Sequence, residues 1–139
     1  MQNLKKNFLT AGKAIFTVSN PTGTRYTFKV SKPRDKEDCP FFVSLLTGPD
    51  NWANYTYMGI YVKQGENFVL KLTAKSRYTD DTLPVKVFRW VSNVLQANQD
   101  LPTGYTIHHE GKCGRCGRRL TVPESIETGF GPECAGKVA

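Results

Sequence analysis

Three of the four cysteines in this 139-residue chain lie close together near its end, with a spacing typical of a metal site. Two residues separate Cys113 from Cys116, and 17 residues separate Cys116 from Cys134. Thiolates of a C-x2-C turn can reach one zinc ion at about 2.3 Å each. Gly117 can take the left-handed conformation that points backbone N–H groups at the sulfurs. We therefore predict a structural Zn²⁺ bound in a zinc knuckle by Cys113, Cys116 and Cys134.

The fourth ligand of this zinc site has three candidates. His109 lies four residues before Cys113, at the end of a strand that leads into the knuckle, and we take it as the ligand. His108 is the next candidate, on the opposite face of that strand. Cys39 lies in a distant charged loop, where an unpaired cysteine is the simpler interpretation. If no side chain completes the shell, water fills it, and Glu110 becomes the nearest general base for a catalytic zinc.

Short helices are expected around the third cysteine. Thr121 and Glu124 form a capping-box pattern, which predicts a helix over PESIET. Cys134 lies near the start of a second helix, PECAGKV, where the helix dipole favours a thiolate. Together with a short strand over residues 105–109, these elements predict a small zinc knuckle or treble-clef-like module over residues 101–139.

The first hundred residues are expected to form a strand-rich body. Alternating apolar and polar residues, with turn residues between the runs, predict five strands. These cover residues 13–19, 25–31, 41–46, 55–63 and 68–75. Helical spacing then predicts one helix over residues 83–98. The expected fold class is α+β, with a five-stranded antiparallel sheet or partly open barrel in residues 1–100, backed by this helix and joined to the zinc module.

The C-terminal motif CGRCGRRLTVPESIETGFGPECAGK resembles an uncharacterised domain family of phage and bacterial proteins. The family signature runs approximately CGxCGRxLTxPESIxxGxGPxC, and its LT-x-PES and G-x-GP elements coincide along with the cysteines. The front half, with GKAIFTVSNPTGTRYTFKV and LLTGPDNWANYTYMG, also looks like a region found beside that domain in phage proteins. The resemblance implies a small phage- or prophage-encoded protein acting inside the host, with Cys113, Cys116 and Cys134 as metal ligands. It implies no activity.

Basic and aromatic residues make nucleic acid the expected partner. The net charge is +7, and residues 1–100 hold most of the surplus, with 14 Lys and Arg against 8 Asp and Glu. Tyr55, Tyr57 and Tyr61 alternate with better core formers, which predicts an outer aromatic face that could stack single-stranded bases. Tyrosines half-buried beneath a helix would give the same pattern. The expected phosphate contacts are Lys29, Lys71, Arg115, Arg118 and Arg119.

Composition and motifs exclude some other classes. No apolar run approaches the roughly 20 residues of a bilayer span, so we expect no membrane partner. Clustered cysteines without a recognisable signal peptide favour a reducing cytoplasm, that of the host cell if the protein is phage-encoded. No catalytic set stands out, which favours non-catalytic binding. The alternatives are a protein that binds and inhibits a host defence or replication protein, and a zinc-dependent hydrolase or nuclease that uses Glu110.

Overall fold

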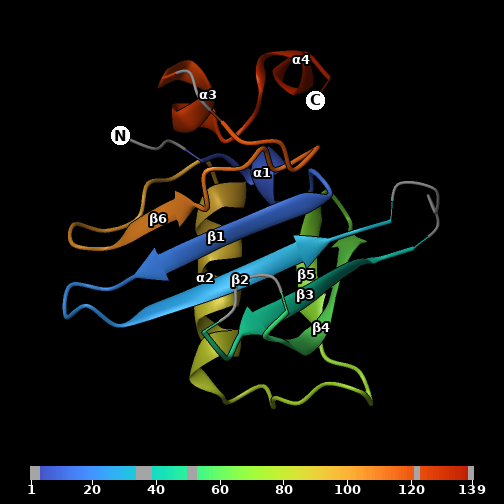
Figure 1. The fold of residues 1–139 in the computed structure, drawn as a ribbon. Coiled ribbons are helices and arrows are strands. Elements are labelled where there is room, and N and C mark those ends of the chain that lie inside the picture. The colour runs from blue at the N-terminus through green and yellow to red at the C-terminus, as the bar shows by residue number, and fades with distance from the viewer. Residues whose placement is uncertain (1–3, 34–38, 50–52, 121–122, 138–139) are drawn as a thin grey trace.

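The computed structural model describes residues 4–33, 39–49, 53–120 and 123–137, and it is built on one antiparallel sheet. Six strands follow one another in the order β5-β4-β3-β2-β1-β6 and curl into a half-barrel (Figure 1). The strands are β1 (Lys13–Ser19), β2 (Arg25–Ser31), β3 (Phe41–Leu46), β4 (Tyr55–Gln64), β5 (Asn67–Lys71) and β6 (Thr106–His109). The antiparallel sheet is confirmed, but the expected number of five strands is wrong. The short β6, which we had assigned to the C-terminal module, pairs with β1 and extends the sheet.

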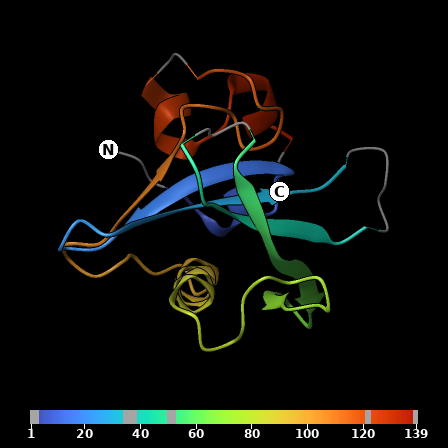
Figure 2. The same ribbon diagram turned by 60° about the horizontal axis from the view of Figure 1, so that its bottom comes forward.

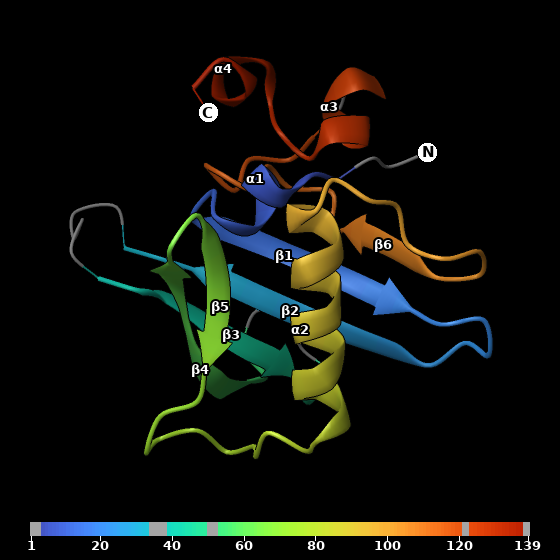
Figure 3. The same cartoon turned by 180° about the vertical axis from the view of Figure 1, so that it is seen from behind.

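Helix α2 (Leu83–Gln96) covers the inner face of the sheet. Figure 2 looks nearly along this helix and shows the sheet curling around it, and Figure 3 shows it lying across the strands. Its apolar residues recur every three or four positions, so they form one buried stripe. Phe88 is the centre of this stripe, and its ring lies 6.3 Å from Phe16, 5.4 Å from Phe28 and 5.4 Å from Tyr61. These four aromatic rings are part of one continuous hydrophobic core.

Strand β4 contains a bulge that reverses its inward and outward faces. Val43 of β3 pairs with Gly59, but the next residue, Ser44, pairs with Tyr57, so Met58 is the extra residue. An extra residue shifts the alternation by one position, because side chains of a strand alternate between faces. Met58 and Tyr61 therefore both point into the core, with exposed fractions of 0% and 1%.

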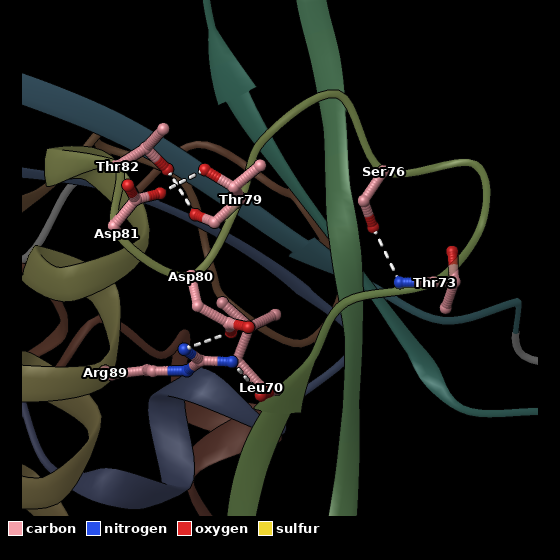
Figure 4. A network of polar contacts seen from close by, with 8 residues as sticks. All are labelled: Leu70, Thr73, Ser76, Thr79, Asp80, Asp81, Thr82 and Arg89. Atoms are coloured by element: carbon pink, nitrogen blue, oxygen red, sulfur yellow. Dashed lines mark hydrogen bonds and ion pairs between the residues drawn. The ribbon is translucent and has the colours of Figure 1, made fainter.

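The loop between β5 and α2 is fixed by polar contacts (Figure 4). The Arg89 guanidinium forms an ion pair with Asp80 at 2.7 Å and donates to the Leu70 carbonyl at 3.0 Å. Thr82 occupies the residue before the helix, as expected of a cap, but its hydroxyl donates to the carbonyl of Thr79 at 2.6 Å. Arg89 thus ties the middle of α2 to the end of β5 and to the loop before the helix.

Three further helices are short: α1 (Lys6–Leu9), α3 (Pro123–Thr128) and α4 (Pro132–Ala135). Helices α3 and α4 lie beyond the β6–β1 side of the sheet, next to α1 (Figures 1 and 3). Phe8 of α1 is fully buried, with its ring 6.5 Å from Phe16 of the sheet and 5.8 Å from Phe130 of the C-terminal segment. The division of the chain near residue 100 stays a prediction. Among the described residues, no helix has the length and apolar character that a membrane crossing needs.

Candidate metal centre

The segment from residue 111 to 120 folds into a tight hairpin that carries the first two cysteines. The Cys113 N–H donates to the Arg118 carbonyl at 2.7 Å, and the Gly117 N–H donates to the Cys113 carbonyl at 2.9 Å. Gly117 has φ +80°, the left-handed conformation that the knuckle prediction required. The hairpin is anchored to the sheet, because the Lys13 N–H donates to the Gly114 carbonyl at 2.7 Å.

The sulfur atoms of Cys113, Cys116 and Cys134 form one cluster. All three lie within 4.8 Å of one another, so they could hold a metal ion. Cys113 and Cys134 are buried, whereas Cys116 is half-buried. The Cys113 sulfur accepts backbone N–H groups from Arg115 at 3.4 Å and from Cys116 at 3.5 Å. Hydrogen bonds of this kind stabilise a thiolate, the form that binds metal.

The electrostatic surroundings of the two buried thiols differ. Burial raises the pKa of Cys113, but the N–H groups of Cys116, Gly131 and Arg115 outweigh it and lower the pKa to about 7. Burial also raises the pKa of Cys134, and a hydrogen bond from the Arg115 guanidinium at 3.5 Å opposes this only in part. Of the two buried thiols, Cys113 is therefore the more readily ionised before a metal arrives.

The structure does not bring His109 into the cysteine cluster. Its Nδ1 accepts the Gly111 N–H at 2.8 Å, so Nε2 carries the proton and donates to the Ile126 carbonyl at 2.6 Å. Both nitrogens are thus engaged by backbone groups, and the ring is 6% exposed. We expected His109 to be the fourth ligand, but in this arrangement its ring nitrogens lie outside the group of cysteine sulfurs. The imidazole instead joins the end of β6 to α3.

The other two candidate ligands, His108 and Cys39, and the possible general base Glu110 also lie outside the cluster. His108 pairs with Thr17 on the outer face of the sheet and is exposed. Glu110 accepts a hydrogen bond from the Thr17 hydroxyl at 3.0 Å. Cys39 is half-buried, and like the other two it is absent from the group of ligand atoms around Cys113. Within the described part of the chain, only the three thiols form that group.

A basic hollow opens beside the cysteine cluster. It has a volume of about 640 Å³, and Cys116 and Cys134 form part of its wall. Its charged lining residues are Arg115, Arg118, Arg119, Lys137 and Glu133. The three arginines had been expected to contact phosphate, and the structure brings them together. Lys137 was missed, although its position three residues after Cys134, just beyond the end of α4, was a usable signal.

The expected aromatic face holds only two of its three tyrosines. The bulge in β4 turns Tyr61 into the core, where its hydroxyl shares a 2.6 Å hydrogen bond with Ser92. Tyr55 and Tyr57 remain on the outer face, and the Lys29 ammonium lies 5.3 Å from the centre of the Tyr55 ring. Lys71 is exposed at the end of β5. Strands β3 and β4 lie between it and Lys29 of β2. The alternation of the tyrosines could not reveal the bulge.

The fold and the site together define a curled antiparallel sheet protein with a three-cysteine site that could hold a metal ion. Residues 107–139 match a family of unknown function, DUF6011. The match covers the end of β6, the knuckle and helices α3 and α4, which supports the expected uncharacterised domain in this part of the chain. Neither a curated protein nor a solved structure matches the chain.

Proposed function

We propose that this protein binds one Zn²⁺ through its three cysteines and binds nucleic acid without catalysis through the basic hollow beside them. The observation that carries the proposal is the grouping of Arg115, Arg118, Arg119 and Lys137 around one concave surface. Arginine forks match phosphate oxygens in a bidentate geometry, and concave basic surfaces concentrate anions.

The cysteine cluster fits zinc in type and in spacing. Thiolates bind Zn²⁺ at about 2.3 Å, which places neighbouring sulfurs of a tetrahedral site about 3.8 Å apart. The present separations, within 4.8 Å, need only side-chain adjustments of about 1 Å to reach that geometry. Zinc would contribute folding free energy here, since it would join the knuckle to α4. The ion would thereby keep Arg115 and Arg118 of the knuckle in the same hollow as Lys137.

A second contact surface is supported on the outer face of the sheet. The ring of Phe42, 38% exposed, lies 6.5 Å from that of Tyr57, and Lys29 lies over Tyr55. Aromatic rings beside cations can stack bases of a single strand, at about 1–3 kcal/mol per base. We therefore expect single-stranded nucleic acid to bind more tightly than duplex.

Fluorescence anisotropy of the zinc-loaded protein with labelled single-stranded DNA, duplex DNA and RNA tests the proposal. Titrations between 50 and 200 mM salt (about the range in which phosphate contacts are resolved) give the salt slope. The double variant R118A/R119A should weaken binding and lower the slope for single strands by about 1.4, because two phosphate contacts are lost. The matched control K63A/K75A removes two exposed charges from the body and should leave the slope unchanged.

Each result has a clear meaning. Equal losses in the two double variants would show that only net charge matters, and the hollow would not be the site. Absence of binding at near-physiological salt would overturn the nucleic-acid proposal. A nuclease-resistant complex with a single host protein in a pull-down would instead support the alternative partner.

A further inference from the structure

The surroundings of the cysteine cluster differ between Cys113 and the other two cysteines. Cys113 is fully buried and its sulfur is covered by the backbone N–H groups of the knuckle. Cys116 and Cys134, in contrast, are part of the wall of the basic hollow. A zinc ion takes four ligands, and the described side chains supply three. The hollow therefore reaches the metal centre from the side of Cys116 and Cys134.

Glu133 is the carboxylate closest in sequence to the cysteine cluster, so it is the first side chain to consider in place of an external ligand. It precedes Cys134 directly and lines the same hollow, yet its carboxylate lies outside the group of ligand atoms. Its side chain is exposed. Glu133 is therefore placed at the rim of the hollow, and its replacement belongs in the test.

The charges around the hollow favour an anion with more than one negative charge. Four cationic side chains and the single carboxylate of Glu133 give the lining a net charge of +3. Zn²⁺ with three thiolates adds −1, which leaves about +2. A phosphomonoester carries about −1.5 to −2 at pH 7, whereas an internal phosphodiester carries a single charge.

We infer that a phosphomonoester binds in the basic hollow and completes the coordination shell of a metal ion held by Cys113, Cys116 and Cys134. This inference rests on the proposed metal site and deepens the proposed function, since a terminal phosphate of a nucleic acid is one source of the group. Free phosphate or a mononucleotide is the other source. The three non-bridging oxygens suit such a site, because one can reach the metal while the others pair with Arg118 and Arg119.

The first experiment uses Co²⁺ in place of Zn²⁺ in the full chain, because the visible absorption bands of Co²⁺ report its ligands. Metal content should first be one ion per chain. Inorganic phosphate should then change the bands saturably, and R118A/R119A should weaken this response at least tenfold. K63A/K75A should respond like the unaltered protein. Absence of metal binding, or bands that phosphate leaves unchanged, would overturn the inference.

Protein ligands are tested in the same spectra. Glu133→Gln and Cys39→Ser should leave the bands of the phosphate-free protein unchanged. A change in either variant would show that the chain itself closes the shell, which would also overturn the inference. His109→Gln serves as a further control on the ligand set, with unchanged bands expected.

The second experiment compares one single-stranded oligonucleotide with and without a 5′-phosphate, by anisotropy. We expect at least tenfold tighter binding of the phosphorylated strand, and competition by inorganic phosphate. Equal binding of both strands, with no spectral response to phosphate, would overturn the inference and leave nucleic-acid binding intact. A spectral response to phosphate or to a mononucleotide without any oligonucleotide binding would support the phosphomonoester site and overturn nucleic-acid binding.

Discussion

The sheet body and the cysteine module of this protein are stabilised by different means. In the body, Phe16, Phe28, Tyr61 and Phe88 pack around one another, and all four are almost fully buried. Among the described residues after β6, the buried apolar side chains other than the cysteines are Leu120 and Phe130. A segment with so little apolar surface to bury needs a metal or a disulfide to hold its shape. The body has no such need.

Phe8 joins the two regions. Its ring contacts Phe16 in the body, and any side chain at Gly114 or Gly129 of the module would collide with it, at 2.6 Å in both cases. The three thiols of the module thus lie close to one another, whereas an apolar residue of α1 contributes to the position of the module on the body. We therefore expect the shape of the module and its placement to have separate causes, which separate substitutions can test.

The largest expected effect is that of Cys113→Ser. Structural zinc in small modules contributes about 10–16 kcal/mol at pH 7, more than the few apolar contacts here can replace. We expect loss of bound metal and loss of hydrogen-exchange protection in residues 111–137, while β2, β3 and α2 stay protected. Mass spectrometry measures both quantities, and Cys39→Ser is the control. Equal loss of protection throughout the sheet would contradict the separation of the two regions.

Phe8→Ala should destabilise the whole chain by about 3–5 kcal/mol, because it leaves a cavity between the two regions. The free energy of unfolding in urea measures this. Phe42→Ala is the matched control, since that ring is 38% exposed and should cost less than about 1 kcal/mol. Similar costs for the two variants would show that Phe8 does not link the regions.

Gly129→Ala should cost more than Gly65→Ala. Both glycines have positive φ, +81° and +67°, so each alanine carries a similar strain of about 1–2 kcal/mol. Only the new methyl group at residue 129 meets the Phe8 ring, and overpacking adds about 1–3 kcal/mol. The difference between the two urea curves isolates the contact of the module with α1. No difference would mean that Phe8 moves aside freely.

The smallest effect concerns the body alone and depends on pH. Burial raises the pKa of Tyr61 to about 12, although the hydrogen bond with Ser92 lowers it in part. Between pH 10 and 12 the unfolded chain releases this proton and the folded chain keeps it, so stability falls as pH rises. The loss should be about 1.4 kcal/mol per pH unit in this window. The Tyr61→Phe variant has no hydroxyl to titrate at this position, so its free energy of unfolding in urea should lack this part of the loss. Identical pH profiles of the variant and the unaltered protein would place Tyr61 outside the core.

Regular periodicity made much of the body predictable. The strands at 13–19, 25–31 and 41–46 agree with the structure, since alternation and turn residues are local signals. The helix expected over 83–98 ends at Gln96, two residues earlier. The spacing of the cysteines likewise predicted the cluster that forms, because the knuckle is a local turn.

Features that depend on distant partners could not be predicted in the same way. Tyr61 and Met58 share the inner face only because β3 meets β4 with an extra residue, which the alternation of β4 does not reveal. His109 was expected to bind metal from its distance along the chain, but its ring is held by Gly111 and Ile126. Helix α1 was not predicted, because four residues carry no helical period.

The position of Phe8 has a consequence for the order in which the chain can fold during its synthesis. The ribosome releases Phe8 more than a hundred residues before Gly114 and Gly129, the positions against which its ring finally packs. Contacts between residues so distant in sequence form slowly, and apolar groups that stay exposed in the meantime promote aggregation. Strands β1 to β5 and α2 can meet as they emerge, but α1 must remain without its neighbours in the cysteine segment until that segment follows. The earliest residues of the described chain are therefore among the last to reach their native packing.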